Sequence, residues 1–159
     1  MIQHIRAYTL PAAYSLLPPQ MASSAASALL LTIGLQESRF LHRRQLGGPA
    51  RGFWQFERGG IAGVLHHQAT AAPIQDALNS LRYTFDRSAT TCHGLVENND
   101  TLACVFARLL LWTEPSALPQ PDEPSKAWDQ YLATWRPGRP HRATFNAFFA
   151  QAWGLVESA

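Results

Sequence analysis

Glu37 is the residue of this sequence whose position best suits acid–base chemistry. The residues four, seven and eight positions before it are Ile33, Leu30 and Leu29, so in a helix its carboxyl group lies on the apolar stripe at the last turn. Partial burial disfavours the charged form of a carboxyl group and raises its pKa, and the negative end of the helix dipole acts in the same direction. A carboxyl group that keeps its proton near neutral pH can serve as a general acid.

A purely structural interpretation of Glu37 is also open. Arg39, Arg43 and Arg44 follow it closely and could form an ordinary ion pair with it at the end of the helix. Structural ion pairs perturb carboxyl groups just as catalytic sites do. Periodicity alone therefore does not decide the role of Glu37, and the neighbouring segments have to be considered.

Two short segments around Glu37 form a recognisable pair. The first is LQESRF at residues 35–40, and the second, after a glycine-rich interval, is GPARGFWQF at residues 48–56. Their order and distance resemble the signature of lytic transglycosylases in the lysozyme-like superfamily. In that family a helix ends in Glu-Ser, and a later Gly-hydrophobic-hydrophobic-Gln segment lines the same cleft. The resemblance covers residues 25–56.

The resemblance implies roles for individual residues. Glu37 matches the catalytic acid and base, Ser38 matches the serine beside it, and Gln55 matches the glutamine that helps to position the sugar. Gly52 matches the glycine that begins the second segment, where a missing side chain lets the backbone approach the cleft. The alternative for Gln55 is an amide that faces solvent from a loop.

Aromatic and basic residues extend this expected site. Phe53 and Trp54 lie within the second segment, where aromatic rings can stack on the faces of sugar rings. The family often has an Ala-Tyr-Asn segment in a later helix, and its best counterpart here, residues 103–108, lacks the Tyr-Asn pair. Arg108 is a polar group that can replace this contact, although a surface arginine with its stem packed along the helix explains it equally well.

Glu57 distinguishes two reactions. With two working carboxylates, Glu37 would protonate the glycosidic oxygen while Glu57 stabilised an oxocarbenium-like transition state or activated water, which is hydrolysis by a muramidase. With Glu37 alone, as the resemblance implies, the same group would then accept a proton from the muramoyl 6-hydroxyl, and the product would be a 1,6-anhydro sugar. The structural alternative for Glu57 is a favourable position at the N-terminus of a short helix.

The composition narrows the function classes. A chain of 159 residues with 47% hydrophobic and 15% charged residues is typical of one globular domain over residues 1–159. The net charge is +2, without the runs of Lys and Arg typical of nucleic-acid binding, apart from Arg136, Arg139 and Arg142 around a Pro-Gly turn. The composition therefore argues against nucleic acid as the partner, and the resemblance implies glycan strands of peptidoglycan instead.

Cysteine and histidine positions give no metal-site pattern. Cys92 and Cys104 permit at most one disulfide, and reduced thiols are the simpler expectation. His93 beside Cys92, and the pair His66 and His67, lack the CxxC or HxxxH spacing of a zinc site. We expect neither a metal ion nor an organic cofactor.

The N-terminal region superficially imitates a secretory signal, because residues 1–6 are positively charged and residues 22–31 are small and apolar. Pro11, Pro18 and Pro19 interrupt it, and no apolar stretch is long enough to span a membrane. We therefore expect a phage or prophage product that is located in the virion or in the host cytoplasm. Another factor or phage virion proteins would deliver it to the periplasm and cell wall.

Helical periodicity dominates the chain. It predicts helices over residues 23–37, 58–65, 73–86, 101–112, 125–135 and 142–156, of which residues 101–112 are apolar enough to form the central buried helix. Strand signals are nearly absent, so the expected fold class is all-α, or mainly α with a minor β-hairpin after Glu37. The resemblance implies a lysozyme-like helical domain with a substrate cleft. Residues 128–140 are similar to C-terminal segments of phage-encoded lysozyme-like proteins, but their spacing predicts no chemical role.

The leading expectation is an enzyme that degrades bacterial cell walls, as endolysins do. It would be a lytic transglycosylase or lysozyme that cleaves peptidoglycan between N-acetylmuramic acid and N-acetylglucosamine. The first rival is a structural or glycan-binding module of a phage particle, with a lysozyme-like fold and no cleavage. The second is a helical interaction protein in which the match to both segments is a coincidence.

Overall fold

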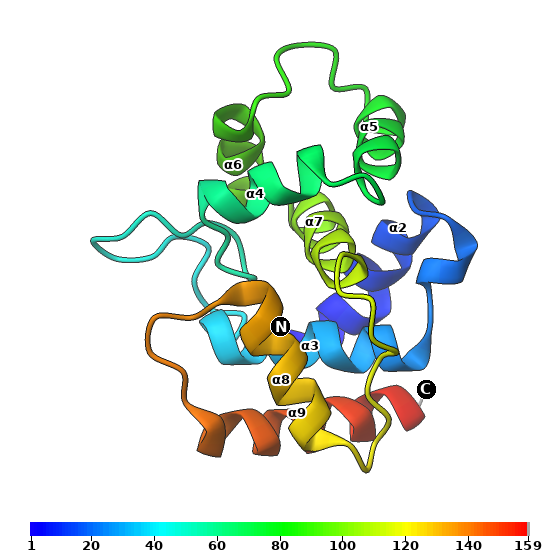
Figure 1. Ribbon diagram of the computed structural model, residues 1–159, viewed down its shortest axis with the longest axis vertical. Coiled ribbons are helices and arrows are strands. Elements are labelled where there is room, and N and C mark those ends of the chain that lie inside the picture. The colour runs from blue at the N-terminus through cyan, green and yellow to red at the C-terminus, as the bar shows by residue number, and fades with distance from the viewer. Residues whose placement is uncertain (159) are drawn as a thin grey trace.

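Every regular element of residues 1–158, the part of the chain that the computed structural model describes, is helical (Figure 1). The loop after Glu37 contains only isolated antiparallel bridges, which join Arg51 to Arg44 and to Phe56. The expected all-α class is therefore confirmed, and the expected hairpin is reduced to these bridges. None of the described helices is both long and apolar enough to cross a membrane.

The helices expected from periodicity are all present. They are α3 (Ser24–Ser38), α4 (Arg58–His66), α5 (Ala71–Ser80), α7 (Asp100–Trp112), α8 (Pro124–Trp135) and α9 (Arg142–Glu157). The main difference is α5, which ends six residues earlier than expected. Arg82 adopts a left-handed conformation (φ 63°) and the Tyr83 N–H donates to Leu78 O at 3.0 Å, which is a standard way of closing a helix.

Two helical regions were not expected from the sequence. One is α6 (Ala89–Asn98), whose N-cap Ser88 accepts a hydrogen bond from Thr91 N–H at 3.2 Å. The other is the N-terminal region, which consists of α1 (Ile2–His4), η1 (Ile5–Thr9), α2 (Leu10–Ser15) and the short 3₁₀ turn η2 (Pro19–Met21).

The first three of these N-terminal elements form one continuous helical segment with a wide turn in its middle. Residues of η1 are wound as a π-helix, and the Leu10 N–H bonds to Ile5 O. Pro11 follows directly, and in a regular α-helix its ring would clash with the carbonyl group of Ala7. The wide turn therefore lies where proline disfavours regular α-helical geometry.

Helix α3 carries Glu37 and Ser38 in its last turn. Its N-cap Ser23 accepts a hydrogen bond from Ala26 N–H at 3.0 Å, as expected. Residues from Leu29 to Leu35 are all buried, so α3 is covered on every side and does not present a single apolar stripe. Helix α3 is therefore more deeply buried than its sequence predicted, and it is a central helix together with α7.

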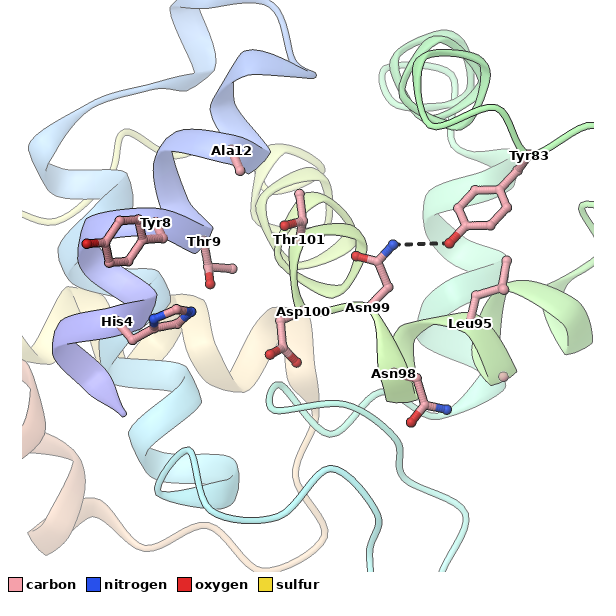
Figure 2. A pocket seen from close by; sticks show the side chains of 11 residues that line it. His4, Tyr8, Thr9, Ala12, Tyr83, Leu95, Asn98, Asn99, Asp100 and Thr101 are labelled. Carbon is pink, nitrogen blue, oxygen red and sulfur yellow. Dashed lines mark hydrogen bonds between the residues drawn. The ribbon is translucent and has the colours of Figure 1, made fainter.

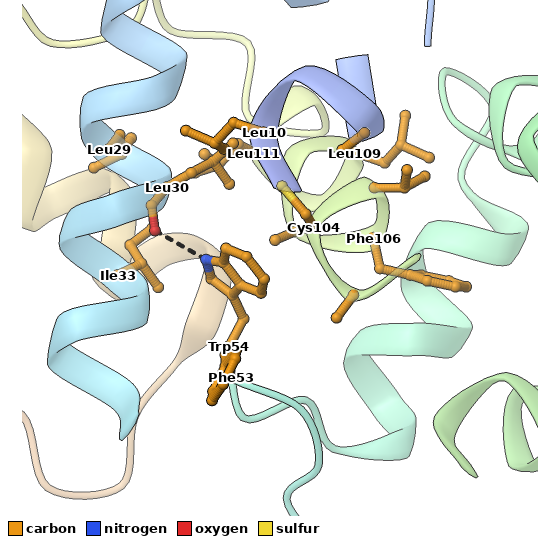
Figure 3. Close-up of a cluster of buried hydrophobic side chains, with 14 of the residues drawn as sticks. Leu10, Leu29, Leu30, Ile33, Phe53, Trp54, Cys104, Phe106, Leu109 and Leu111 are labelled. Atoms are coloured by element: carbon orange, nitrogen blue, oxygen red, sulfur yellow. Dashed lines mark hydrogen bonds between the residues drawn. The ribbon is translucent and has the colours of Figure 1, made fainter. Parts of the chain in front are cut away.

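Helix α3 packs along α9 and also contacts α7 and the N-terminal segment (Figure 1). Helices α4, α5 and α6 gather at the other end of α7. Figure 3 shows the core where α3, α7 and the N-terminal segment meet around Trp54. The indole Nε1 of Trp54 donates to Leu30 O at 2.9 Å, and this bond fixes the loop after α3 to the side of that helix.

Candidate functional site

The carboxyl group of Glu37 lies half-buried in the last turn of α3. Its Oε1 accepts a hydrogen bond of 2.6 Å from the hydroxyl group of Tyr131. Burial raises the pKa of Glu37 to about 7, and the bond from Tyr131 acts in the opposite direction because it stabilises the carboxylate. Glu37 therefore titrates in the range in which a carboxyl group can both give and accept a proton near neutral pH.

Tyr131 is a residue of the site that the sequence analysis missed. It belongs to α8, is only 2% exposed, and stacks on Phe145 of α9 with ring centroids 5.1 Å apart. The Trp128 ring packs against the Tyr131 ring, with centroids 5.6 Å apart. Burial and the neighbouring Glu37 raise the pKa of Tyr131. The phenol therefore stays protonated and donates the hydrogen bond to Glu37. The stripe Trp128, Tyr131 and Trp135, at helical spacing, was the signal available in the sequence.

Ser38 joins the two segments that define the resemblance. Its hydroxyl group donates to Phe53 O at 2.6 Å and accepts from Phe40 N–H at 3.2 Å. Ser38 is buried, so these bonds occupy the hydroxyl group inside the protein. The structure thus places the end of α3 beside the Gly-Phe-Trp-Gln segment, but it gives Ser38 a linking position and not one on the surface.

Phe53 and Trp54 do not lie on a sugar-binding surface, contrary to the expectation from the sequence. Both are 0% exposed. The Phe40 ring packs edge-on against both of them, and the Trp135 indole donates to Trp54 O at 2.9 Å. Rings that are wholly enclosed cannot stack on a ligand, so these two residues hold the loop against α3 and α8.

Gly52 and Gln55 form the turn that this loop makes. Gly52 has φ 74°, and a Cβ atom there would lie 2.7 Å from Val96 O of α6. The close approach expected of this glycine is therefore made to a neighbouring helix and not to a cleft. Gln55 has φ 49°, and its side-chain amide donates to Gly52 O at 2.8 Å. No hydrogen bond among residues 1–158 joins Gln55 to Glu37.

Arg108 lies elsewhere than expected. It is 2% exposed, its Nε donates to Met21 O at 2.7 Å, and its guanidinium group lies over the Trp112 ring. Burial lowers the pKa of this arginine. Arg108 fixes α7 to the turn that precedes α3, so both the cleft contact and the surface position expected from the sequence are wrong.

Glu57 occupies the N-cap position of α4 and is exposed. Its side chain makes no capping hydrogen bond, and no hydrogen bond among the described residues joins it to Glu37. This placement matches the structural alternative, in which the carboxylate lies at the positive end of a helix dipole.

Helix α6 and the start of α7 anchor the loop between α3 and α4. Glu97 accepts two hydrogen bonds of 2.9 Å from Arg44 and forms an ion pair of 3.1 Å with Arg51. Asp100 binds Arg43 through both of its oxygens, at 2.9 and 2.7 Å. Arg43 and Arg44, which could have paired with Glu37, therefore bind other carboxylates, and the guanidinium group of Arg39 lies over the Phe148 ring, 4.2 Å from its centroid. His93, which was considered as a zinc ligand, bonds through Nε2 to Phe56 O.

Two cavities of about 550 Å³ each are formed by the N-terminal helical segment, and Glu37 lines neither of them. Within residues 1–158, no group of three or more His, Cys, Asp or Glu side chains is placed to hold a metal ion. The chemistry that this arrangement offers is that of one proton-holding carboxyl group, oriented by a phenol and supported by the enclosed loop.

Comparison of the chain with models of known families, with curated proteins and with solved structures finds no match. The features of the chain that bear on its function are the geometry around Glu37 and the resemblance of the two short segments.

Proposed function

We propose that this protein cleaves the glycan strands of peptidoglycan between N-acetylmuramic acid and N-acetylglucosamine, as a lytic transglycosylase with Glu37 as its single acid and base. The observation on which this depends is the half-buried Glu37 carboxyl group with its pKa raised to about 7 and its Oε1 bonded to Tyr131. A general acid is most effective when its pKa lies near the working pH.

The reaction needs two proton transfers at the same group. Glu37 first gives its proton to the glycosidic oxygen as the bond from that oxygen to the muramoyl C1 breaks, which leaves an oxocarbenium-like sugar. The Glu37 carboxylate then accepts the proton of the muramoyl 6-hydroxyl as that oxygen bonds to C1. A 1,6-anhydro end forms and the acid is regenerated. Tyr131 stabilises the carboxylate between the two steps, because it donates to Oε1.

The position of Glu57 supports a mechanism with one carboxylate over hydrolysis with two. Retaining and inverting glycosidases place two carboxyl groups on either side of the scissile bond. Glu57 is exposed at the N-cap of α4, a position that the helix dipole alone explains. Hydrolysis would require Glu57 as a second working carboxylate, whereas the transglycosylase needs only Glu37, which Tyr131 already orients.

Digestion of purified sacculi by wild type, Glu37→Gln and Glu57→Gln tests the proposal. The wild type should release muropeptides that end in 1,6-anhydromuramic acid, which are 18 Da lighter than hydrolytic products by general chemistry and are resolved by mass spectrometry. Glu37→Gln should lose at least about 10³-fold in rate, by the usual size of general acid–base effects. Glu57→Gln should retain most of the wild-type rate. Reducing ends together with a loss of activity in Glu57→Gln would instead establish the hydrolytic muramidase.

A second candidate function is a glycan-binding module without cleavage. The observation in its favour is that both cavities lie away from Glu37 while the aromatic rings Phe53 and Trp54 are enclosed. A wild-type protein that binds sacculi but leaves their glycan chain lengths unchanged would support this candidate over the enzyme. In either case, delivery to the cell wall by a phage particle or from the host cytoplasm is part of the proposal.

A further inference from the structure

One of the two cavities lies between the N-terminal helical segment and the start of α7 (Figure 2). His4, Tyr8 and Thr9 line one side, and Asn98 and Thr101 line the other. Its volume of about 550 Å³ falls within the range of sites that bind small molecules. Neither Glu37 nor Tyr131 lines this cavity, so it is separate from their hydrogen bond.

The charge in this cavity is compensated. Asp100 is the acidic residue of its lining, and both of its oxygens accept hydrogen bonds from Arg43. The titratable group that remains is His4, whose imidazole packs on the Tyr8 ring with centroids 5.0 Å apart. An anionic or cationic ligand would therefore find no free opposite charge from a carboxylate or guanidinium group of the lining.

The remaining polar groups are uncharged and unoccupied. Among residues 1–158, the side chains of Tyr8, Thr9, Asn98 and Thr101 make no hydrogen bond to another protein group. Tyr83 accepts a hydrogen bond of 3.1 Å from Asn99 and keeps its own hydroxyl proton for another partner. Hydroxyl and amide groups both donate and accept, which matches the hydroxyl and acetamido groups of sugars.

Thr9 offers a hydroxyl group to this cavity that no other group of residues 1–158 bonds. The residue is 5% exposed, and its hydroxyl group has no hydrogen-bond partner within the described chain. Figure 2 shows this hydroxyl directed into the space that faces Asp100. The hydroxyl oxygen is not among the buried side-chain atoms that lack a partner, so it is reached from the cavity and is free to bond a ligand that enters it. Thr9 also ends the π-helical turn η1, and such turns are frequent at functional sites.

We propose that this cavity binds an uncharged saccharide unit, with Thr9 and Thr101 bonding its hydroxyl or amide groups and the exposed ring of Tyr8 covering one face. Aromatic rings of this kind combine an apolar face with a polar end. The site is additional to Glu37 and does not depend on the proposed cleavage. A second saccharide-binding site would keep a glycan strand bound to the protein whether or not the strand is cleaved.

Nuclear magnetic resonance of the ¹⁵N-labelled Glu37→Gln protein tests this inference directly. N,N′-diacetylchitobiose serves as a neutral disaccharide probe, and the substitution prevents cleavage at Glu37 from affecting the titration. We expect saturable shifts of the backbone amides of Thr9, Asn98 and Thr101. Shifts confined to the surroundings of residue 37, or saturable binding of adenosine but not of the disaccharide, would overturn the proposal.

Thr9→Val, added to the same protein, separates a binding role from a structural one. Valine has the shape of threonine without the hydroxyl group, and removal of a hydroxyl that bonds no protein group should not lower the melting temperature. The affinity for the disaccharide should fall about 5- to 10-fold, the usual effect of one lost hydrogen bond. Ser24→Ala, which removes a hydroxyl group from the lining of the other cavity, should leave the affinity unchanged. Equal affinity in Thr9→Val would refute the role of this residue.

Discussion

Glu37 is the residue on which both the proposed chemistry and part of the stability of this protein depend. Burial favours its neutral form, and the hydroxyl group of Tyr131 partly offsets this by stabilising the carboxylate. The residue is thus held between two protonation states, which is useful to a catalyst but costs free energy whenever the carboxylate is formed.

Glu37→Gln should stabilise the protein above neutral pH. The folded pKa of Glu37 is about 7 against a reference of 4.5, so the unfolded state loses its proton first as pH rises. The contribution of Glu37 to stability is complete below about pH 4.5 and is lost as the pH rises from 4.5 through 7, by about 3 kcal/mol for a shift of this size. Urea unfolding should show the variant to be more stable than wild type at pH 8, with a much smaller difference at pH 4.5.

The exposed carboxyl group of Glu57 supplies the control for this measurement. Glu57→Gln removes the same charge at the surface, and it should lack the stabilisation at pH 8 that is expected of Glu37→Gln. A Glu37→Gln protein that is less stable than wild type at pH 8 would show that the carboxylate form is favoured in the folded state, and the acid proposed here would be lost.

Tyr131→Phe should raise the pKa of Glu37, because the hydrogen bond that favours the carboxylate is removed. Carbon-detected magnetic resonance of the carboxyl group should show this rise. In an active enzyme the alkaline limb of kcat/KM should move to higher pH, and kcat should fall about tenfold or more with the loss of a charge-assisted bond.

Tyr14→Phe is the matched control for this variant. Tyr14 is a tyrosine of α2 whose hydroxyl group pairs with Ser27 at 2.9 Å, and it has no bond to the site. It should leave the titration of Glu37 unchanged. An unaltered Glu37 titration in Tyr131→Phe would mean that the 2.6 Å bond does not control this carboxyl group.

At the scale of elements, α3 was the most predictable helix and α6 the least. The serines at positions 23 and 24 and the apolar run after them specify α3 locally, so its N-terminus could be predicted to within one residue. Helix α6 contains Thr90, Thr91 and Gly94, which are weak helix formers. Its contacts are tertiary, since Glu97 holds the arginines of a distant loop, and a local pattern does not predict such contacts.

The same distinction applies to the candidate site. The position of Glu37 at the end of an apolar helix, and the pairing of its segment with the one around Gly52, follow from nearby sequence. The contact with Tyr131 does not, because 94 residues separate the two. Exposure is also a property of the whole fold, which is why Trp54 was expected on a surface and lies in the core.

Gly34→Ala tests the end of α3. A Cβ atom at Gly34 would lie 2.1 Å from Cζ of Phe40, whose ring is enclosed by Phe53 and Trp54. Although alanine favours helices, the overlap should dominate and lower the free energy of unfolding by about 1–2 kcal/mol. Gly63→Ala in α4 meets no atom within 4 Å and should raise stability by up to about 1 kcal/mol. Urea unfolding of both variants measures the difference, and equal effects would contradict this packing.

At the scale of the whole molecule, one continuous cluster of buried side chains extends from the N-terminal segment to α9. Cys92 and Cys104 lie in it as free thiols, as the sequence suggested, and both are 0% exposed. Burial raises the pKa of each thiol. The core is therefore held by packing, without a covalent cross-link between these two residues.

Reductant should not change the melting temperature, because there is no disulfide to break. A thiol reagent such as dithionitrobenzoate should react very slowly with the native protein, since the reactive thiolate is both rare and inaccessible. Two thiols per chain should react once guanidinium unfolds it. Rapid reaction of either cysteine under native conditions would show that the core opens far more readily than this packing implies.

The wide turn η1 holds one residue more than the α-helix around it would hold in the same span. Deletion of one residue within Ile5–Thr9 should therefore restore ordinary winding, and the residues before the deletion should keep nearly the same orientation around the helix axis relative to α2. The change would fall on the turn itself, which carries Tyr8 and Thr9 of the cavity lining. The shape of this cavity can thus be altered by a change of length, while the helical residues on either side of the turn keep their places.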